Sequence, residues 1–332
     1  MVCTVLKRFA KSVMQSKENN KMKFYIGVDG GGTKTAYALF DENKNIVADY
    51  EGPASNHENM EGSFPEAAGI IADGINGLLN KAGKSLSDVE GMLMGLAGID
   101  HPYQHDAMQE ELGKLGIKGA RIYNDGFIVI KAGVGSGAGI GYNCGTGTCC
   151  NCLDTNGNML QIGGFDVLSG DKANGHWVGN QAFRIMYDQL CLGKGKSQIT
   201  ELMNEKTGIC DRATLLDSIA VLESEDEGEA FLRKLIVSFF EAANNDDEEA
   251  LKVIEEMAQR GADYICGHIN AMTFDCDVIN VVLSGSIHTK LPSYKYTDRM
   301  AQLVEERTNR KFNFIKLDCA PVMGCINWLL EE

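Results

Sequence analysis

Asp29-Gly-Gly-Gly-Thr-Lys-Thr35 joins two apolar segments, residues 24–29 and 33–40, that have the composition of β-strands. Consecutive glycines let neighbouring backbone N–H groups converge on an anion, and Thr33 adds a hydroxyl donor beside them. Asp29 can hold Mg²⁺ directly or through water. A glycine hairpin without a ligand is the alternative, although three glycines exceed what a hairpin needs. The segment therefore predicts a phosphate-binding turn made of Gly30, Gly31, Gly32, Thr33 and Lys34.

The two commonest nucleotide-binding loops are absent from the sequence. GxxxxGK[ST] does not fit residues 29–35, and no complete GxGxxG occurs anywhere in the chain. Beyond residue 40, a polar turn at 41–45 leads to a third strand at 46–51, and apolar residues at helical spacing follow at 64–82. The pattern then predicts a strand at 89–96, a helix near 103–115 and a strand at 120–123, which together make an α/β unit.

A second module of the same kind begins about 114 residues later. Ile26-Gly27 corresponds to Ile140-Gly141, and the turn Asp41-Glu-Asn-Lys-Asn45 corresponds to Asp154-Thr-Asn-Gly-Asn158. Such self-similarity indicates a duplicated unit, although short strand-turn-strand matches also arise by chance. A second Gly/Thr hairpin occupies the place of the first glycine turn, so that the two could hold a triphosphate between them. Its predicted phosphate contacts are Gly145, Thr146, Gly147 and Thr148.

The rest of the second half alternates helices with two more strands. Helices are predicted at 174–190, 212–221, 229–243, 246–268 and 298–310. Strands are predicted at 278–283 and 312–317, and a last helix begins at Ala320. A chain of 332 residues exceeds what one hydrophobic core usually organises, so two domains are expected.

Composition narrows the partners and the compartment. A formal charge of −15 argues against nucleic acid and anionic membrane surfaces as partners, and no apolar run reaches the roughly 18 residues that a bilayer crossing needs. Eleven cysteines without a repeated CxxC pair indicate reduced thiols in a cytoplasmic protein. Four of them crowd together without the spacing of a zinc site, so buried strand thiols are favoured over a metal cluster. These four are Cys144, Cys149, Cys150 and Cys152.

Residues 1–22 precede the first predicted strand and pair with no motif. Residues 1–21 hold five Lys/Arg against one Glu, with apolar residues at weakly amphipathic spacing. They lack the long apolar stretch and the cleavage site of a signal peptide. We predict a dispensable N-terminal extension, with a transit segment as the alternative. A protein that starts at Met22 is then expected to keep its fold and activity.

An ordered set of short motifs extends from about Lys23 to the C-terminus. These are Asp29-Gly-Gly-Gly-Thr33, Gly95-Leu-Ala-Gly98, Asn124-Asp125-Gly126, Gly145-Thr-Gly-Thr148, Gly163-Gly164 with Gly170-Asp171, His176-Trp-Val-Gly179 and Leu283-Ser-Gly-Ser286. In this order they resemble the N-acetylglucosamine kinase and BadF/BadG/BcrA/BcrD ATPase family of the actin/Hsp70/hexokinase superfamily. The resemblance implies an α/β, two-lobed, actin-like (ribonuclease H-like) fold with a duplicated domain, mixed sheets and flanking helices. It also implies an N-terminal lobe at 23–125, rejoined by the last helix at 320–332, and a C-terminal lobe at 126–319.

The same resemblance implies an ATP-dependent, Mg²⁺-requiring kinase that phosphorylates the 6-hydroxyl of an amino sugar, with N-acetylglucosamine as the first expectation. Asp125 matches the catalytic aspartate that faces this hydroxyl, the two hairpins match paired phosphate-binding turns, and Gly285 matches the glycine turn near the adenosine. The matched sugar-binding positions are Asn56, Gly98, Gly164, Phe165, Asp166 and Asp171. From the residues alone, Asp125 is equally part of an ordinary Asn-Asp-Gly turn or a base placed after a strand.

The chain departs from the family pattern in the sugar segment. Where relatives commonly read Gly-Asp-Glu-Gly-Ser, it reads Gly170-Asp-Lys-Ala-Asn174. Asp166 replaces a usual glycine, and Phe165 stands where the human-type kinase has Trp. The sugar is therefore left open among N-acetylglucosamine, glucosamine, N-acetylmuramate and glucose.

Two other functions remain open at this point. An ATPase that activates a partner dehydratase belongs to the same family, but the iron–sulfur cysteine expected after Asp171-Lys172 is absent here. A non-catalytic sugar sensor is the third reading. The sequence also leaves the oligomeric state open, with a homodimer among the alternatives.

Overall fold

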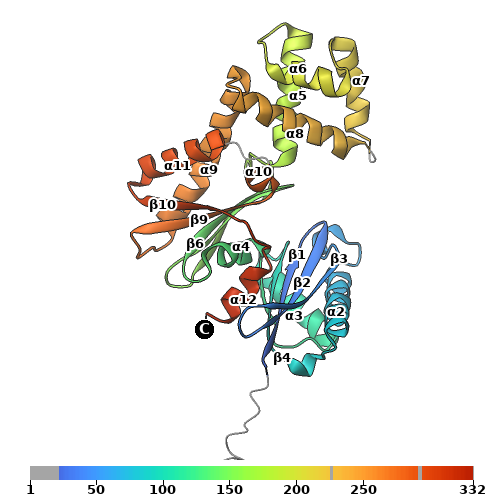
Figure 1. The fold of residues 1–332 in the computed structure, drawn as a ribbon, viewed down its shortest axis with the longest axis vertical. Helices are drawn as coiled ribbons and strands as arrows, with labels where there is room; N and C mark the ends of the chain where they lie inside the picture. The colour runs from blue at the N-terminus through green and yellow to red at the C-terminus, as the bar shows by residue number, and fades with distance from the viewer. Residues whose placement is uncertain (1–21, 225–226, 291–293, 332) are drawn as a thin grey trace, which may run out of the picture.

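The structure is a computed structural model that describes residues 22–224, 227–290 and 294–331. The predicted N-terminal extension lies, apart from Met22, outside the described residues. Two five-stranded sheets follow one another along the long axis, and a group of helices lies beyond the second sheet (Figure 1).

The first sheet has the strand order β3-β2-β1-β4-β5. Its strands β1, β2 and β3 form an antiparallel meander, while β4 and β5 run parallel to β1. Their bounds are β1 Phe24–Gly30, β2 Lys34–Asp41, β3 Ile46–Pro53, β4 Val89–Leu96 and β5 Arg121–Tyr123. All five lie within one or two residues of the strands predicted from the sequence.

The second sheet repeats this order as β10-β9-β6-β7-β8. Its meander is β6 Gly139–Cys144, β7 Thr148–Leu153 and β8 Met159–Gly163, and its parallel strands are β9 Val278–Ser284 and β10 Lys311–Lys316. The two β-hairpin turns share one hydrogen-bond pattern. Asp41 accepts from the backbone N–H of Asn43 and Asn45, and Asp154 accepts from those of Asn156 and Asn158. This common pattern confirms the predicted duplication.

Helices cover both faces of the first sheet. Alternate strand residues such as Ile26 and Val28 pack against α2 (Ser63–Ala82) and α3 (Pro102–Lys114). The other face, with Tyr25, packs against α4 (Asp125–Val134) and α12 (Met323–Leu329). Two 3₁₀ turns, η1 (His57–Asn59) and η2 (Leu86–Asp88), complete this part of the chain.

A glycine at the corresponding position of each sheet lets one helix pack closely against that sheet. A Cβ on Gly27 would lie 2.8 Å from Cys325 Cβ of α12, and one on Gly141 would lie 2.9 Å from Ile130 of α4. The two helices also touch each other, because a Cβ on Gly324 would overlap the carbonyl of Ile128. Helix α4 therefore contacts both sheets, and α12 packs between the first sheet and α4.

The other face of the second sheet is covered by α9 (Glu248–Ala271) and α11 (Tyr294–Thr308). The helical group beyond it contains α5 (Gly175–Leu192), α6 (Gln198–Thr207), α7 (Arg212–Leu222) and α8 (Gly228–Asn244), and a short α10 (Ser286–Thr289) follows β9. The predicted helices are confirmed apart from their ends. The short helices α4, α6 and α10 were not predicted, and the run Phe127-Ile-Val-Ile130 in α4 has a composition that favours strands.

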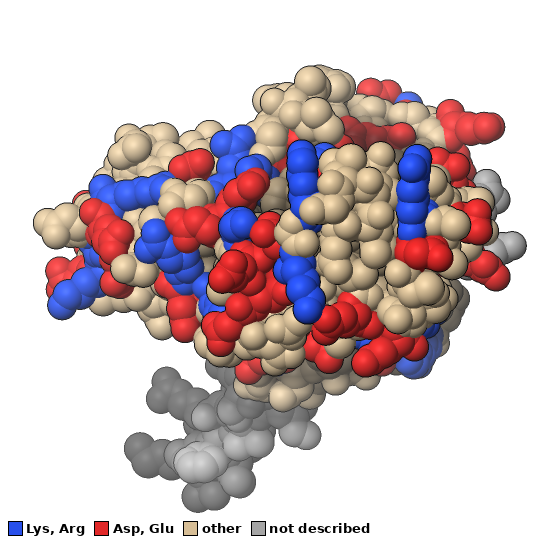
Figure 2. Space-filling model, turned by 90° about the horizontal axis from the view of Figure 1, so that it is seen from above, with Lys and Arg blue, Asp and Glu red and all other residues tan. Residues whose placement is uncertain are grey.

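Charge is mixed over the face seen in Figure 2. Lysine and arginine alternate there with aspartate and glutamate, and no broad basic area occupies that face. Within the described ranges, no helix combines the length and the apolar character that a membrane crossing requires.

Candidate functional site

A polar cavity of about 470 Å³ lies between the two sheets and receives residues from both. From the predicted set, it is lined by Asn56, Gly98, Asp125, Thr146, Gly147, Thr148, Gly164, Asp166 and Asp171. Its lining also includes Glu58, Ala97, Asp100, Asn124, Asn143, Cys149, Gln161, Asn174 and His176. Segments that lie more than a hundred residues apart in sequence thus border one space.

Asp125 is the first residue of α4, directly after β5. The preceding Asn124 caps the helix, because its Oδ1 accepts from the N–H of Gly126 at 2.9 Å, while its Nδ2 donates to Asp100 Oδ1 at 2.9 Å. Asn124-Asp125-Gly126 is thus the start of a helix rather than an isolated turn. Burial, together with the nearby charge of Asp100, raises the pKa of Asp125 to about 6, although the N–H groups of residues 125 and 126 lower it. The carboxylate is ionised at neutral pH and its pKa is close enough to accept a proton.

Asp29 lies at the end of β1, on the strand next to β4. Burial and the charge of Asp125 raise the pKa of Asp29 to about 7, and Lys34 lowers it only in part. Lys34 itself is exposed and pairs with Glu51 of β3 at 2.5 Å. The charge of Asp125 thus raises the pKa of Asp29, and a hard divalent cation beside these two carboxylates would relieve the repulsion.

In the first glycine turn, tight packing accounts for one of the three glycines, and backbone angles account for none of them. Gly30, Gly31 and Gly32 all lie outside the positive-φ region. A Cβ on Gly30 would meet Ser55 Oγ at 2.5 Å, so packing explains this glycine. Gly31 closes the turn through its N–H, which donates to the carbonyl of Lys34 at 3.0 Å. Thr33 is exposed beside it.

The second hairpin is tied to the N-terminus of α5. Gly145 N–H donates to Gly147 O, and its carbonyl accepts from Gly175 N–H, each at 2.9 Å. The partial positive charge of an 18-residue helix N-terminus therefore lies beside this turn. Thr148 is buried and its hydroxyl donates to the carbonyl of Lys172 at 2.9 Å, so its side chain holds the following loop.

A second cavity, of about 340 Å³, continues on the other side of this hairpin. Thr146 and His176 line both cavities. The remaining walls come from α8 and α10: Glu229, Leu232, Arg233, Ile236, Val237, Ser286, Ile287 and Lys290, with Gly145 and Gly175. Gly285, which precedes α10, has φ +83°, and a Cβ there would lie 2.2 Å from the carbonyl of Cys144. Gly285 is required for the close approach of β9 to the hairpin.

Gly145→Val is expected to raise the KM for nucleotide at least tenfold while the fold is kept. The position has no positive φ, and its nearest new contact would be Gly285 Cα at 3.8 Å, so the protein itself tolerates the side chain. Only a ligand held against the hairpin would be crowded. Gly31→Val tests the first turn in the same way, although its Cβ would lie 3.2 Å from the carbonyl of Lys34. Initial rates over a range of ATP concentrations measure both, and unchanged KM values would remove the paired-hairpin interpretation.

Asn56 and Gly98 lie against each other at one end of the cavity. Asn56 caps η1 by accepting from Glu58 N–H at 3.0 Å. A Cβ on Gly98, which has φ +79°, would be 2.5 Å from Asn56 Oδ1. His57 stacks on Phe64 with ring centroids 4.0 Å apart and is buried, which agrees with a structural role.

The loop after β8 contains the other predicted sugar residues. Asp166 has φ +49°, a conformation that glycine adopts freely and that other residues rarely take. Asp171 is buried, and its Oδ2 accepts from the N–H groups of Gly164 and Asp166 at 2.9 and 3.0 Å. Phe165 is half-exposed and does not line the cavity, so the structure separates it from the other five sugar positions.

The sequence contains no signal for a chain of hydrogen-bonded polar side chains along the wall of the cavity. Asp100 accepts from Asn124, whose Oδ1 accepts from Asn151 Nδ2 at 3.3 Å. Asn151 Nδ2 also donates to Gln161 Oε1 at 3.1 Å. The amide nitrogen of Gln161 then faces Gly164, where an added Cβ would lie 3.0 Å from it. Asn124 stood in a quoted motif, but the others lie in strands or in a loop with no spacing signal.

The cysteine cluster consists of strand thiols, as expected. Cys144, Cys150 and Cys152 are buried, burial raises the pKa of each thiol, and the cysteines of the described ranges are free. Only Cys149 reaches the main cavity.

Two curated relatives are kinases of amino sugars. An N-acetylmuramic acid/N-acetylglucosamine kinase of Clostridium acetobutylicum is 27% identical over 165 residues, which is 49% of this chain and 53% of that protein. An N-acetyl-D-glucosamine kinase of Dictyostelium discoideum is 25% identical over 204 residues, 58% of this chain and 63% of that protein. The chain thus matches little more than half the length of these curated relatives.

Solved structures confirm the two-lobed, actin-like fold. A candidate N-acetylglucosamine kinase from Chromobacterium violaceum aligns over 94% of this chain and 100% of its own, with a TM-score of 0.62 and 20% identity. A ROK family glucokinase from Streptomyces griseus, solved with glucose and AMPPNP, aligns over 92% and 97% with a TM-score of 0.55 and 15% identity. The sequence model of the BadF/BadG/BcrA/BcrD ATPase family matches residues 26–326. The chain therefore belongs to the BadF/BadG/BcrA/BcrD ATPase family, as its ordered motifs predicted.

Proposed function

We propose that this protein transfers the γ-phosphoryl group of ATP to the 6-hydroxyl of an amino sugar, with N-acetylglucosamine as the first candidate. The observation that carries the proposal is Asp125, a carboxylate with a pKa of about 6 in a polar cavity bordered by the second glycine hairpin. The names of the two curated relatives support an amino sugar rather than an unmodified hexose.

In this proposal the cavity of about 470 Å³ holds the sugar and the γ-phosphate, and the neighbouring one of about 340 Å³ holds the adenosine. Asp125 orients the 6-hydroxyl for in-line attack and accepts its proton. Thr146 and Gly147 contact the phosphates with the hydroxyl and N–H groups of the hairpin, and the N-terminus of α5 stabilises negative charge there.

Asp29 would hold Mg²⁺, and the residues fit this ion. The raised pKa values of Asp29 and Asp125 indicate carboxylates that favour a neighbouring cation. Among the described residues no group of three or more His, Cys, Asp or Glu side chains forms a metal site by itself. That agrees with Mg²⁺, which usually binds one or two carboxylates together with phosphates and water. When bound, the ion would neutralise charge on the β- and γ-phosphates.

The lobe boundaries are part of the same proposal. We place the N-terminal lobe at 23–125 with 320–332, and the C-terminal lobe at 126–319, with α4 and α12 as the joint between them. Closure about this joint would exclude water, so that the phosphoryl group reaches the sugar rather than water. The free thiols of the described ranges fit a reducing, cytoplasmic compartment.

A coupled ADP-release screen over N-acetylglucosamine, glucosamine, N-acetylmuramate and glucose tests the proposal. We expect the largest kcat/KM with an N-acetylated sugar, and phosphorus NMR of the product should place the phosphate on the 6-oxygen. ATP turnover that is independent of every sugar would favour the partner-activating ATPase instead. Sugar binding by calorimetry without any turnover would favour the sensor.

A further inference from the structure

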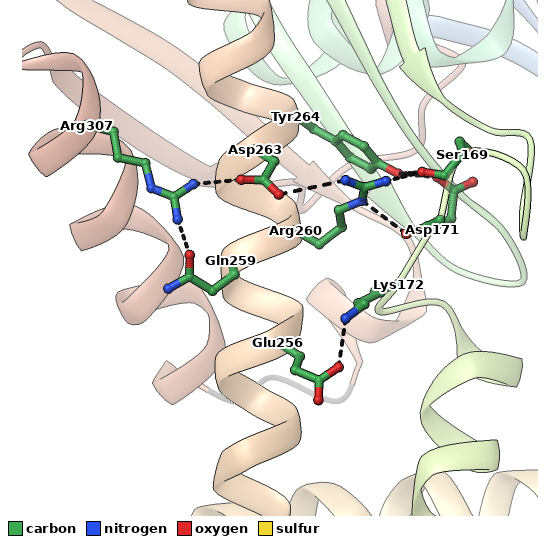
Figure 3. Close-up of polar contacts among 10 residues, drawn as sticks. Ser169, Asp171, Lys172, Glu256, Gln259, Arg260, Asp263, Tyr264 and Arg307 are labelled. Atoms are coloured by element: carbon green, nitrogen blue, oxygen red, sulfur yellow. Dashed lines mark hydrogen bonds and ion pairs between the residues drawn. The ribbon is translucent and has the colours of Figure 1, made fainter.

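The loop between β8 and α5 is held from outside by one face of α9 (Figure 3). Arg260 donates through Nε to the carbonyl of Gly170 at 3.0 Å and through Nη2 to the carbonyl of Ser169. One helical turn further, the hydroxyl of Tyr264 donates to Asp171 Oδ1. Both side chains therefore contact the loop that carries the proposed sugar residues, without lining the cavity themselves.

Asp171 has protein partners on both of its carboxylate oxygens. Oδ1 accepts from Tyr264, and Oδ2 accepts from the N–H groups of Gly164 and Asp166. The side chain is only 6% exposed. A carboxylate bonded in this way fixes the loop and is a poor alternative to Asp125 as the base.

The loop is shaped to receive these two α9 side chains. A Cβ on Gly163, which has φ +75°, would lie 3.1 Å from the Tyr264 ring and 2.9 Å from Asp171 Oδ1. A Cβ on Gly170, with φ +64°, would lie 2.9 Å from Arg260 Nη2. The guanidinium carbon of Arg260 also lies 4.8 Å from the centre of the Tyr264 ring. Glycine therefore stands at the two positions, 163 and 170, where the α9 side chains come closest to the loop backbone.

We propose that Tyr264 and Arg260 are positioning residues for the sugar. By bonding Asp171 and the carbonyls of residues 169 and 170, they hold the loop in the one conformation in which Gly164 and Asp166 border the sugar. This inference rests on the proposed function. Burial and the Asp171 carboxylate raise the pKa of Tyr264, so its hydroxyl stays a donor throughout the physiological pH range.

Tyr264→Phe and Arg260→Gln are the variants that test it. Because hydrogen bonds to charged groups are strong, we expect the KM for the sugar to rise roughly tenfold or more in each. The KM for ATP and kcat should stay within about threefold, since neither residue touches the hairpins. Arg260→Lys should recover part of the loss, because one amine can still bond a loop carbonyl but cannot reproduce the fork of Arg260.

Arg307→Gln is the matched control. Arg307 of α11 bonds Asp263 of α9 at 2.8 Å and also Gln259, whereas Arg260 lies 3.7 Å from the same Asp263 and bonds the loop. Both arginines thus interact with Asp263 of α9, but of the two only Arg260 is bonded to residues 169 and 170. The control should leave the sugar KM unchanged. An unchanged sugar KM in Tyr264→Phe and Arg260→Gln, or an equal rise in Arg307→Gln, would overturn the inference.

Hydrogen–deuterium exchange separates this inference from the proposed function. The amides of Gly164 and Asp166 are bonded to Asp171, so a peptide spanning 160–172 should exchange faster in Tyr264→Phe and Arg260→Gln than in Arg307→Gln or the unmodified protein. Failure of every sugar as a substrate would remove the proposed function but leave this result valid. Equal exchange in all four proteins would remove the positioning role, whatever the substrate.

Discussion

Asp125→Asn is expected to lower kcat by about 10²–10⁴-fold, the usual contribution of a positioned acid–base group. The amide keeps the size of the side chain but cannot accept the proton of the attacking hydroxyl. The KM values for sugar and ATP should change little, because the transferred proton matters most in the transition state. Steady-state kinetics with the best sugar of the screen measures this effect.

Thermal unfolding of Asp125→Asn distinguishes a catalytic role of Asp125 from a structural one. Because burial and Asp100 raise the pKa of Asp125, removing its charge should leave the melting temperature unchanged or slightly higher at pH 8. An unfolded variant would make the residue a structural part of the α4 N-terminus. A folded variant with full turnover would move the base elsewhere in the cavity.

The pH profile gives a second measurement on the same residue. A base with a pKa of about 6 must be ionised, so kcat/KM should fall tenfold per pH unit below about pH 6. Asp100→Asn removes the like charge that raises this pKa, and the acid limb should therefore move to lower pH. An acid limb that stays in place would show that Asp125 does not set the profile.

The sequence alone predicted the elements that have strong local signals. The glycine turns, the Asp-x-Asn-x-Asn hairpins at 41–45 and 154–158 and most helices needed only local pattern, and the order of the motifs predicted the family. The sequence contains no signal that places Gln161, Asn143 or Asn174 in the cavity. These residues line the cavity because the tertiary structure brings the two sheets and the N-terminus of α5 together. Their spacing along the chain does not indicate this proximity.

The roles of two predicted residues depended on contacts that the sequence does not contain. Lys34 follows the glycines, and its ammonium pairs with Glu51 across the β2–β3 ladder, so the phosphate contact of this residue stays a prediction. Asp171 was expected at the sugar, and its oxygens bond the loop and a tyrosine more than ninety residues away. In both cases the residue type indicated contact with a ligand, whereas the hydrogen-bond or ion-pair partner in the protein depends on the tertiary structure.

Asp29→Asn is expected to reduce turnover by about 10²-fold or more, since a metal ion usually supplies several kcal/mol of charge stabilisation to phosphoryl transfer. The Mg²⁺ concentration needed for half-maximal rate should rise at the same time. Titration of Mg²⁺ at saturating ATP and sugar measures this. A rate and a Mg²⁺ requirement equal to those of the unmodified protein would place the metal elsewhere.

The same substitution is expected to stabilise the ligand-free protein at pH 8. The folded-state pKa of Asp29, about 7, lies above its unfolded value of about 3.8, so the stabilisation from this group is present below pH 4 and is lost as the pH rises through 7. At pH 8 the native state therefore contains an unfavourable buried charge beside Asp125, and a neutral amide removes it. The melting temperature of Asp29→Asn should exceed that of the unmodified protein by roughly 3 °C or more at pH 8, and the difference should shrink toward pH 4. Calorimetry at both pH values tests this, and a variant that melts lower at pH 8 would mean that Asp29 serves the fold rather than the metal.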